Sequence, residues 1–86
     1  MYLHIGSNIY LWSERIIGIY HASVLQDNPE GQNFLAKSKI FSHNVPEEDV
    51  KSCIVTDRHE VYFSKVSCRT LRQRWNVLKR EISLTS

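Results

Sequence analysis

Two short runs of β-forming residues with a tight polar connection between them constrain this chain more than any other feature. Residues 50–56 (VKSCIVT) and 60–64 (EVYFS) are rich in β-branched and aromatic residues, and Asp-Arg-His at residues 57–59 separates them. Paired runs around so short a connection are typical of a β-hairpin. The apolar members of the pair are expected to supply part of the core: Ile54, Val55, Val61 and Phe63.

The N-terminal part of the chain predicts a second hairpin and a further strand. Residues 3–5 alternate in polarity, residues 6–8 (GSN) are turn formers, and residues 9–12 are another apolar run. Residues 16–20 (IIGIY) have no polar side. Such a strand is usually central in its sheet or covered on both faces, by helices of its own subunit or by a neighbouring subunit. Gly18 inside the run indicates a bulge or a close approach by another backbone.

The middle of the chain predicts one helix and one short strand. The sequence DNPE at residues 27–30 combines a capping side chain, a proline in the first turn and an acid at the positive end of the helix dipole. We expect this helix to reach Ser38 and to bury Phe34 and Leu35. Residues 40–43 are expected to form a short strand, followed by a polar loop.

The C-terminal segment predicts the clearest helix, with Ser67 as its cap. Leu71, Trp75, Leu78 and Ile82 are spaced four, three and four residues apart, so they fall within an arc of about 60° and form one apolar stripe. Arg74 flanks this stripe. Four cations fall within about 100° on the far side of the helix: Arg69, Arg72, Lys79 and Arg80.

These elements predict a small α+β domain with a mostly antiparallel sheet and two helices. Eighty-six residues are enough for one domain with a modest core. We expect the domain to cover residues 1–82 and the tail, residues 83–86, to be frayed.

The charge of the chain is unevenly distributed, although its formal net charge is only +2. Residues 1–66 hold six basic and eight acidic residues, whereas residues 67–86 hold five basic residues and one acid. A basic helix side can pair with phosphates through charge-assisted bonds and counterion release. It can equally be an ordinary solvated surface, so the sequence leaves both interpretations open.

The two cysteines and the chain start bear on where the protein resides. A disulfide scaffold of this size usually carries four or more cysteines, so Cys53 and Cys68 are expected to be reduced thiols. Residues 1–5 enter a strand directly, without the basic and apolar regions of a secretory signal. No run approaches 18 apolar residues. We therefore expect a cytoplasmic protein without a membrane partner.

No group of residues forms a motif for catalysis or for metal binding. The four histidines are scattered without zinc-ligand spacing, and no serine has a nucleophile-elbow context. The glycines are isolated, so there is no phosphate-binding loop. Three adjacent acids at residues 47–49 do not converge as ligands of a divalent ion. We expect a non-enzymatic protein with no cofactor, no metal and no small-molecule substrate.

Four pieces of the chain, taken in order, resemble one bacterial family. They are LHIG at residues 3–6, ERIIGI at residues 14–19, the strand pair KSCIVT and VYFS at residues 51–56 and 61–64, and LRQR at residues 71–74. Over roughly residues 1–75 the chain is similar to the small extracellular matrix regulators RemA and RemB. The opening MYLHIG and the strand pair are closest to the RemB branch.

The resemblance implies a cytoplasmic DNA-binding regulator of biofilm-matrix genes. It also implies subunits that assemble into a closed ring, a fold related to the LytTR type, and DNA that follows the basic surface of the ring. Arg15 matches the arginine of the family's Arg-Ile-Ile motif. The RemA branch carries a basic cluster before the second hairpin, where this chain has Glu47, Glu48 and Asp49 and keeps only Lys51. Anions there repel phosphate, so RemA-style wrapping of DNA does not transfer to this loop.

Two function hypotheses follow. In the first, a RemB-like regulator binds DNA as a homo-oligomer through contacts to backbone phosphates. Its candidate DNA contacts are Arg15, Lys51, Arg69, Arg72, Lys79 and Arg80. In the second, a protein-interaction module assembles with itself or with a basic paralogue and does not touch DNA. Its candidate contacts are Glu47, Glu48 and Asp49.

Overall fold

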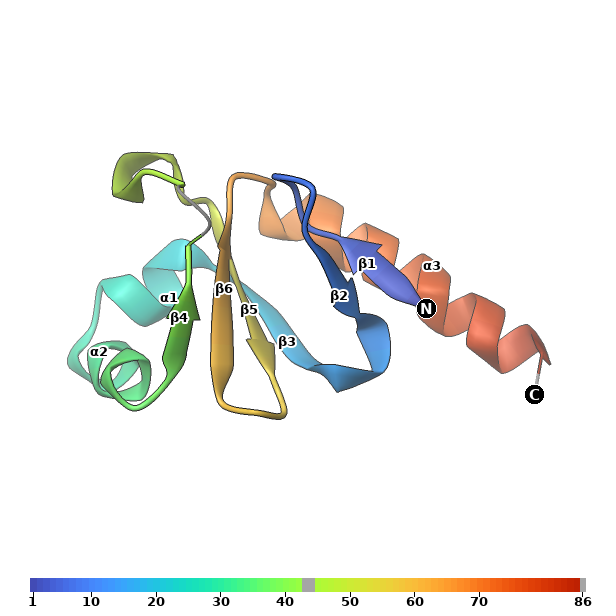
Figure 1. Ribbon diagram of the computed structural model, residues 1–86, viewed down its shortest axis with the longest axis horizontal. Helices are drawn as coiled ribbons and strands as arrows, with labels where there is room; N and C mark the ends of the chain where they lie inside the picture. Colours follow the sequence, from blue (N-terminus) through green and yellow to red (C-terminus); the bar gives the residue numbers. More distant parts are fainter. Residues whose placement is uncertain (43–44, 86) are drawn as a thin grey trace.

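The computed structural model describes residues 1–42 and 45–85 of an elongated molecule that measures 41 × 21 × 18 Å. Figure 1 shows a four-stranded sheet in the middle, two short helices at one end and a long helix that extends away at the other end. A two-stranded hairpin lies beside the long helix. The predicted α+β class and the mostly antiparallel strand pairing are therefore confirmed.

The larger sheet has the strand order β3-β5-β6-β4. Strands β3 (Ile16–His21), β5 (Ser52–Thr56) and β6 (Glu60–Ser64) pair antiparallel, and β4 (Lys39–Phe41) joins β6 in parallel. The predicted hairpin is β5–β6, and the predicted short strand is β4. His43, which was expected in that strand, lies outside the described residues.

The N-terminal hairpin is also confirmed, but as a separate two-stranded sheet. Strands β1 (Tyr2–His4) and β2 (Tyr10–Trp12) pair antiparallel. Their connection contains three consecutive residues with positive φ: Gly6 at 95°, Ser7 at 51° and Asn8 at 60°. Such φ values are characteristic of tight hairpin connections.

Of the two arrangements expected for the apolar strand, central in the sheet or covered on both faces, the central one is wrong, because β3 is an edge strand. Its register with β5 shifts between Ile16 and Gly18, so the predicted bulge is confirmed. The extra residue allows Ile16 and Ile19 to face the same core while Ile17 points to the other face, 61% exposed. The apolar run therefore covers one side of the sheet and leaves an exposed isoleucine on the other side.

The described residues form three α-helices, where the sequence predicted two. The predicted middle helix is α2 (Pro29–Ala36), and the side chain of Asn28 caps it by accepting from the Gly31 N–H at 2.7 Å. The unpredicted helix is α1 (Ala22–Gln26), a single turn that packs against α2. A Cβ on Gly31 would lie 2.4 Å from a backbone oxygen of α1, so glycine is what permits this close contact.

The last helix, α3 (Cys68–Thr85), includes three of the four residues expected in a frayed tail. The fourth, Ser86, lies outside the described residues. So does the side chain of Ile82, the last member of the predicted apolar stripe.

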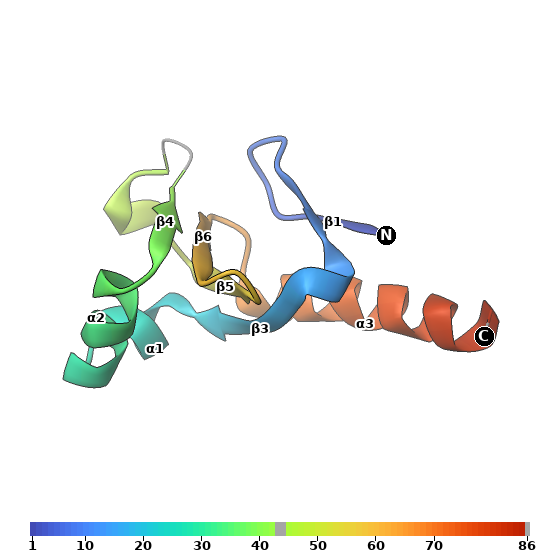
Figure 2. The same ribbon diagram turned by 60° about the horizontal axis from the view of Figure 1, so that its bottom comes forward.

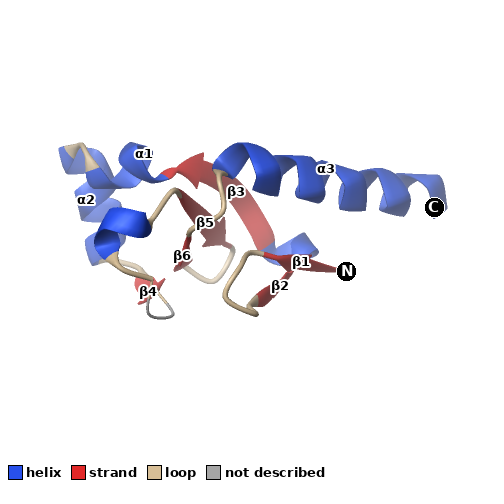
Figure 3. Ribbon diagram, turned by 90° about the horizontal axis from the view of Figure 1, so that it is seen from above, coloured by secondary structure: helices blue, strands red, loops and turns tan. Residues whose placement is uncertain are grey.

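Two cores lie on opposite faces of the larger sheet. Neighbouring residues of β5 point to opposite faces, so Ile54 belongs to the first core while Cys53 and Val55 belong to the second. On the first face the hairpin β1–β2 and α3 cover the sheet, and on the second face α1 and α2 cover part of it. Figure 2 and Figure 3 show these covering elements from two further directions.

Candidate nucleic-acid interface

Helix α3 is attached to the molecule along one side. The Ser67 hydroxyl accepts from the Thr70 N–H at 3.2 Å, which caps the first turn as predicted. Leu71 is fully buried in the first core, and Trp75 and Leu78 pack against that core. This packing confirms the described part of the predicted stripe. It sets the rotation of the helix, so the opposite side must face solvent.

The solvent side of α3 carries the four predicted cations, which we call the cationic strip: Arg69, Arg72, Lys79 and Arg80. All four are exposed. Eleven residues separate the first from the last, which corresponds to about 17 Å along the helix axis. Residues 68–80 contain five cations and no acid. The strip is therefore a continuous field of positive charge on a packed support.

Arg72 connects the strip to the edge of the sheet. Its Nε donates to the carbonyl oxygen of Ile19 in β3 at 2.8 Å. A guanidinium group has five N–H donors in a planar fork, so this bond orients the group and uses only one donor. The remaining donors are available to an anion.

Two hydrogen bonds to backbone carbonyls attach the middle of α3 to the N-terminal part of the chain, and one cation–π contact lies within the helix. The Trp75 indole donates to the carbonyl oxygen of Ser13 at 3.3 Å. The Lys79 ammonium lies 3.5 Å from the centroid of the Trp75 ring, which is within cation–π range. Arg74, on the flank, donates to the carbonyl oxygen of His4 at 3.0 Å. These contacts reduce the conformational freedom that a phosphate contact would otherwise have to remove.

Arg15 and Lys51 lie at opposite ends of β5. Arg15 Nη1 is 3.7 Å from Oδ1 of Asp57, directly after the strand. Lys51 precedes the strand, where its N–H donates to the Ser64 carbonyl at 2.9 Å and its own carbonyl accepts from Ala22 at 3.0 Å. Six residues of extended chain separate the two cations by about 20 Å. The structure does not bring Arg15 and Lys51 together in one surface.

Lys51 lies at the end of the sheet where α3 begins. Its neighbour Ser52 donates to the carbonyl of Val66 at 2.7 Å, and Lys65 and Arg69 lie on either side of Val66 in sequence. Lys65 is exposed but was not among the predicted contacts. The position of Lys65, between the predicted hairpin and the predicted helix, is the sequence feature that could have identified it.

The predicted acidic contacts form a separate, exposed turn. Glu47, Glu48 and Asp49 make up the 3₁₀ turn η2 (Glu47–Asp49), which has no side-chain cap. Figure 1 places η2 at the end of the molecule away from the C-terminus of α3. Within the described residues, no three His, Cys, Asp or Glu side chains are arranged to hold a metal ion.

Three described side chains have shifted pKa values. Burial raises the pKa of the Cys53 thiol to about 11. Burial and the nearby Glu60 charge raise the pKa of Tyr62, while hydrogen bonds, first of all from the backbone, lower the pKa of Glu14. At neutral pH the first two groups remain protonated and Glu14 remains ionised. Both cysteines are free, as expected, and nothing in these shifts indicates a nucleophile.

The sequence did not predict an aromatic surface on the hairpin, which we call the hairpin face. It consists of the exposed rings of Tyr2, Tyr10 and Trp12, on the side of β1–β2 opposite the buried Leu3 and Leu11. The Tyr2 and Trp12 rings meet edge to face at 4.9 Å. The alternation Tyr-Leu-His and Tyr-Leu-Trp was the signal that could have revealed this surface.

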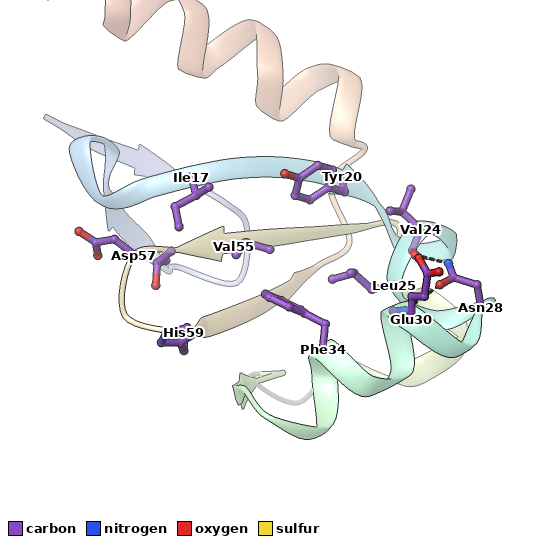
Figure 4. A pocket seen from close by; sticks show the side chains of 12 residues that line it. Ile17, Tyr20, Val24, Leu25, Asn28, Glu30, Phe34, Val55, Asp57 and His59 are labelled. Atoms are coloured by element: carbon purple, nitrogen blue, oxygen red, sulfur yellow. Dashed lines mark hydrogen bonds between the residues drawn. The ribbon is translucent and has the colours of Figure 1, made fainter.

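The sequence also did not predict a groove on the second face of the larger sheet, which we call the sheet groove. It encloses about 520 Å³. Figure 4 shows its floor on β3 and β5 and its wall on α1 and α2. Its apolar lining includes Ile17, Tyr20, Val24, Phe34 and Val55. Only tertiary structure assembles this set.

The chain matches no model of a protein family and no curated protein. Among the helices of the described residues, none combines the length and the apolar character needed to cross a membrane. The function proposed below therefore depends on the chain's own chemistry and on the family that its sequence resembles.

Proposed function

We propose that this protein is a non-enzymatic, RemB-like DNA-binding regulator of biofilm extracellular-matrix genes, which acts in the cytoplasm as a homo-oligomer. The observation that carries the proposal is the cationic strip. Arg69 and Arg80 are exposed on a helix whose other side is packed into the core, and Arg72 and Lys79 lie beside them with defined contacts. The contacts of Arg72 and Lys79 lower the side-chain entropy that these two cations would lose on contact with a phosphate.

The proposed contact is to the phosphates of the DNA backbone. Arginine and lysine side chains along one side of a helix can pair with successive phosphates through charge-assisted hydrogen bonds. Phosphate contacts release condensed counterions, so binding by this surface depends strongly on salt. Assembly of several copies would repeat the strip along one DNA molecule.

Arg15 has a lesser place in this proposal than the four α3 cations. Its guanidinium lies beside Asp57, which partly neutralises it. Lys51 lies near the first turn of α3 and can extend the strip at that end.

The test is a mobility shift of a duplex DNA of mixed sequence by the full chain, repeated at several salt concentrations. We expect binding at about 50 mM salt and a steep loss of affinity by about 200 mM. Failure to shift DNA at the lower salt concentration contradicts the proposal.

The exposed acidic turn supports a second candidate function. All three carboxylates of η2 are exposed on a short 3₁₀ turn, which suits contact with a basic protein surface, such as that of a basic paralogue. In this alternative the chain is an assembly module that does not bind DNA. Neutralising η2 would then abolish partner binding, whereas neutralising the strip would have no effect on it.

A further inference from the structure

The hairpin face and the sheet groove are two apolar surfaces on opposite faces of one sheet. The hairpin packs on the first core and the groove opens beside the second core. Figure 4 looks into the groove with the hairpin behind the sheet. We propose that the hairpin face of one copy docks into the sheet groove of the next copy, which assembles the chain head to tail. This inference rests on the homo-oligomer of the proposed function and names its interface.

The hairpin face has the size and chemistry of an interface core. Tyr2, Tyr10 and Trp12 are 63%, 60% and 43% exposed, in a chain with six tyrosine and tryptophan residues. At 150–250 Å² per aromatic side chain, their exposed area is roughly 250–400 Å². A small stable interface buries about 600 Å² on each partner, so the three rings would supply about half of one side. Tyrosine and tryptophan are also the residues most enriched at interface centres.

The sheet groove is an open hollow with a mainly apolar lining. Ile17 and Val24 are 61% and 47% exposed at its surface. Gly18 contributes to the depth of the groove, because a Cβ there would lie 2.4 Å from the Tyr20 hydroxyl oxygen. The absence of that Cβ allows the Tyr20 ring to lie flat over β3 and form part of the floor. The groove can therefore receive an aromatic surface from another chain.

The charges beside the two surfaces are opposite in sign. Glu30 and Asp57 line the groove, and Asp57 is paired with Arg15, which leaves Glu30 as the excess charge. Beside the hairpin face, the Met1 ammonium is paired with Glu14 at 3.3 Å, and Arg74 at the β1 edge is the excess charge. Docking of unlike surfaces therefore brings an anion toward a cation.

Docking of like surfaces lacks this complementarity. Two hairpin faces packed against each other would bring two copies of Arg74 into one interface and leave both grooves empty. Contact between unlike patches is heterologous, so it continues from copy to copy and closes into a ring when the rotation permits. It also leaves Arg69 and Arg80 uncovered, because neither belongs to a docking surface, whereas Lys79 lines a hollow next to Ile17 at the border of the groove.

The experiment measures the solution mass of the full chain and of single variants, without DNA. Tyr10→Glu blocks the hairpin face, Ile17→Glu blocks the sheet groove, and Val77→Glu is the control at a half-exposed position on α3. We expect a wild-type mass several times the 10.1 kDa of one chain, the same mass for the control, and monomers for the two blocked variants.

An equimolar mixture of the two blocked variants then distinguishes the docking modes. Each variant keeps the surface that the other has lost, so one contact forms and the mixture has twice the chain mass. A monomeric wild type, a wild-type dimer, unchanged mass in the blocked variants or a mixture that remains monomeric would each overturn the proposal. If circular dichroism shows that a blocked variant is unfolded, Trp12→Glu or Val24→Glu replaces it.

A charge exchange provides an independent measurement. Glu30→Arg and Arg74→Glu should each raise, several-fold, the protein concentration at which the oligomer dissociates. The double variant should restore the wild-type value, because every contact then again brings opposite charges together. Neither residue belongs to the cationic strip. Variants that no longer assemble but still bind DNA would therefore separate this interface from the proposed DNA contact. Variants that still assemble but no longer bind DNA would also separate the two surfaces.

Discussion

The cationic strip on α3 and the acidic turn η2 differ in how the fold holds them. The strip lies on a helix whose buried side contains Leu71 at 0% exposure and Trp75 packed on the core. The turn is a short 3₁₀ segment without a side-chain cap, and all its carboxylates are exposed. Charge on α3 is therefore positioned by packing, whereas charge on η2 depends on local backbone alone. We infer that the strip can bind with defined geometry and that the turn modulates the field around it.

The largest effect is expected from removing the support of the strip. Leu71→Ala deletes a fully buried side chain, so the free energy of unfolding should fall by about 2–5 kcal/mol. Neutralising η2 with Glu47→Gln and Glu48→Gln should change it by less than about 0.5 kcal/mol, because both side chains are exposed. Urea denaturation measures both values. Equal decreases in the free energy of unfolding would mean that the fold holds the strip and the turn η2 equally firmly.

Removing charge from the strip itself should have the next largest effect. The double variant Arg69→Gln and Arg80→Gln removes two exposed cations, so DNA affinity at about 50 mM salt should fall by at least tenfold. The matched control is the double Glu-to-Gln variant of η2, which should bind as well as wild type or more tightly. Fluorescence anisotropy with a labelled duplex measures both, and a comparable loss in the control would refute the distinction.

Arginine positions within the strip should differ from one another. Arg72→Lys loses the Nε bond to Ile19, so stability should fall by about 1 kcal/mol. Arg69→Lys keeps the charge at an exposed position and should be neutral. If thermal or urea unfolding shows the two variants to be equally stable, the Arg72 contact does not hold α3 to the sheet edge.

The smallest effect is expected from reversing charge on the turn. Glu48→Arg with Asp49→Arg should tighten DNA binding by less than tenfold at low salt. The gain should shrink as salt rises to about 150 mM, where the screening length falls to about 8 Å. A gain as large as the loss from the Arg69 and Arg80 double variant would place η2 against the DNA.

The elements with local signals were predictable from the sequence. The alternation of polar and apolar residues and the tight turns predicted both hairpins, and the helix start at Asn28-Pro29 predicted α2. The four-three-four spacing gave the buried side of α3, and hence the side on which the cations lie. Each of these features depends on residues within a few positions of one another.

The features that depend on tertiary arrangement were not predictable. An all-apolar strand is usually central or covered on both faces, yet β3 lies at the edge of the sheet, and its bulge turns Ile17 outward. Helix α1 is too short for a periodic pattern and is held by packing against α2. The separation of Arg15 from Lys51 follows from the register of β3 with β5, which no local pattern specifies.

The dependence of DNA affinity on salt tests the central claim most directly. Each phosphate contact contributes about −0.9 to the slope of log affinity against log salt concentration. The account predicts a steep slope for the wild-type chain and a slope shallower by about 2 per bound chain for the Arg69→Gln, Arg80→Gln variant. Identical slopes for the two proteins, or no binding by the wild type at about 50 mM salt, would contradict the assignment of α3 as the DNA-binding surface.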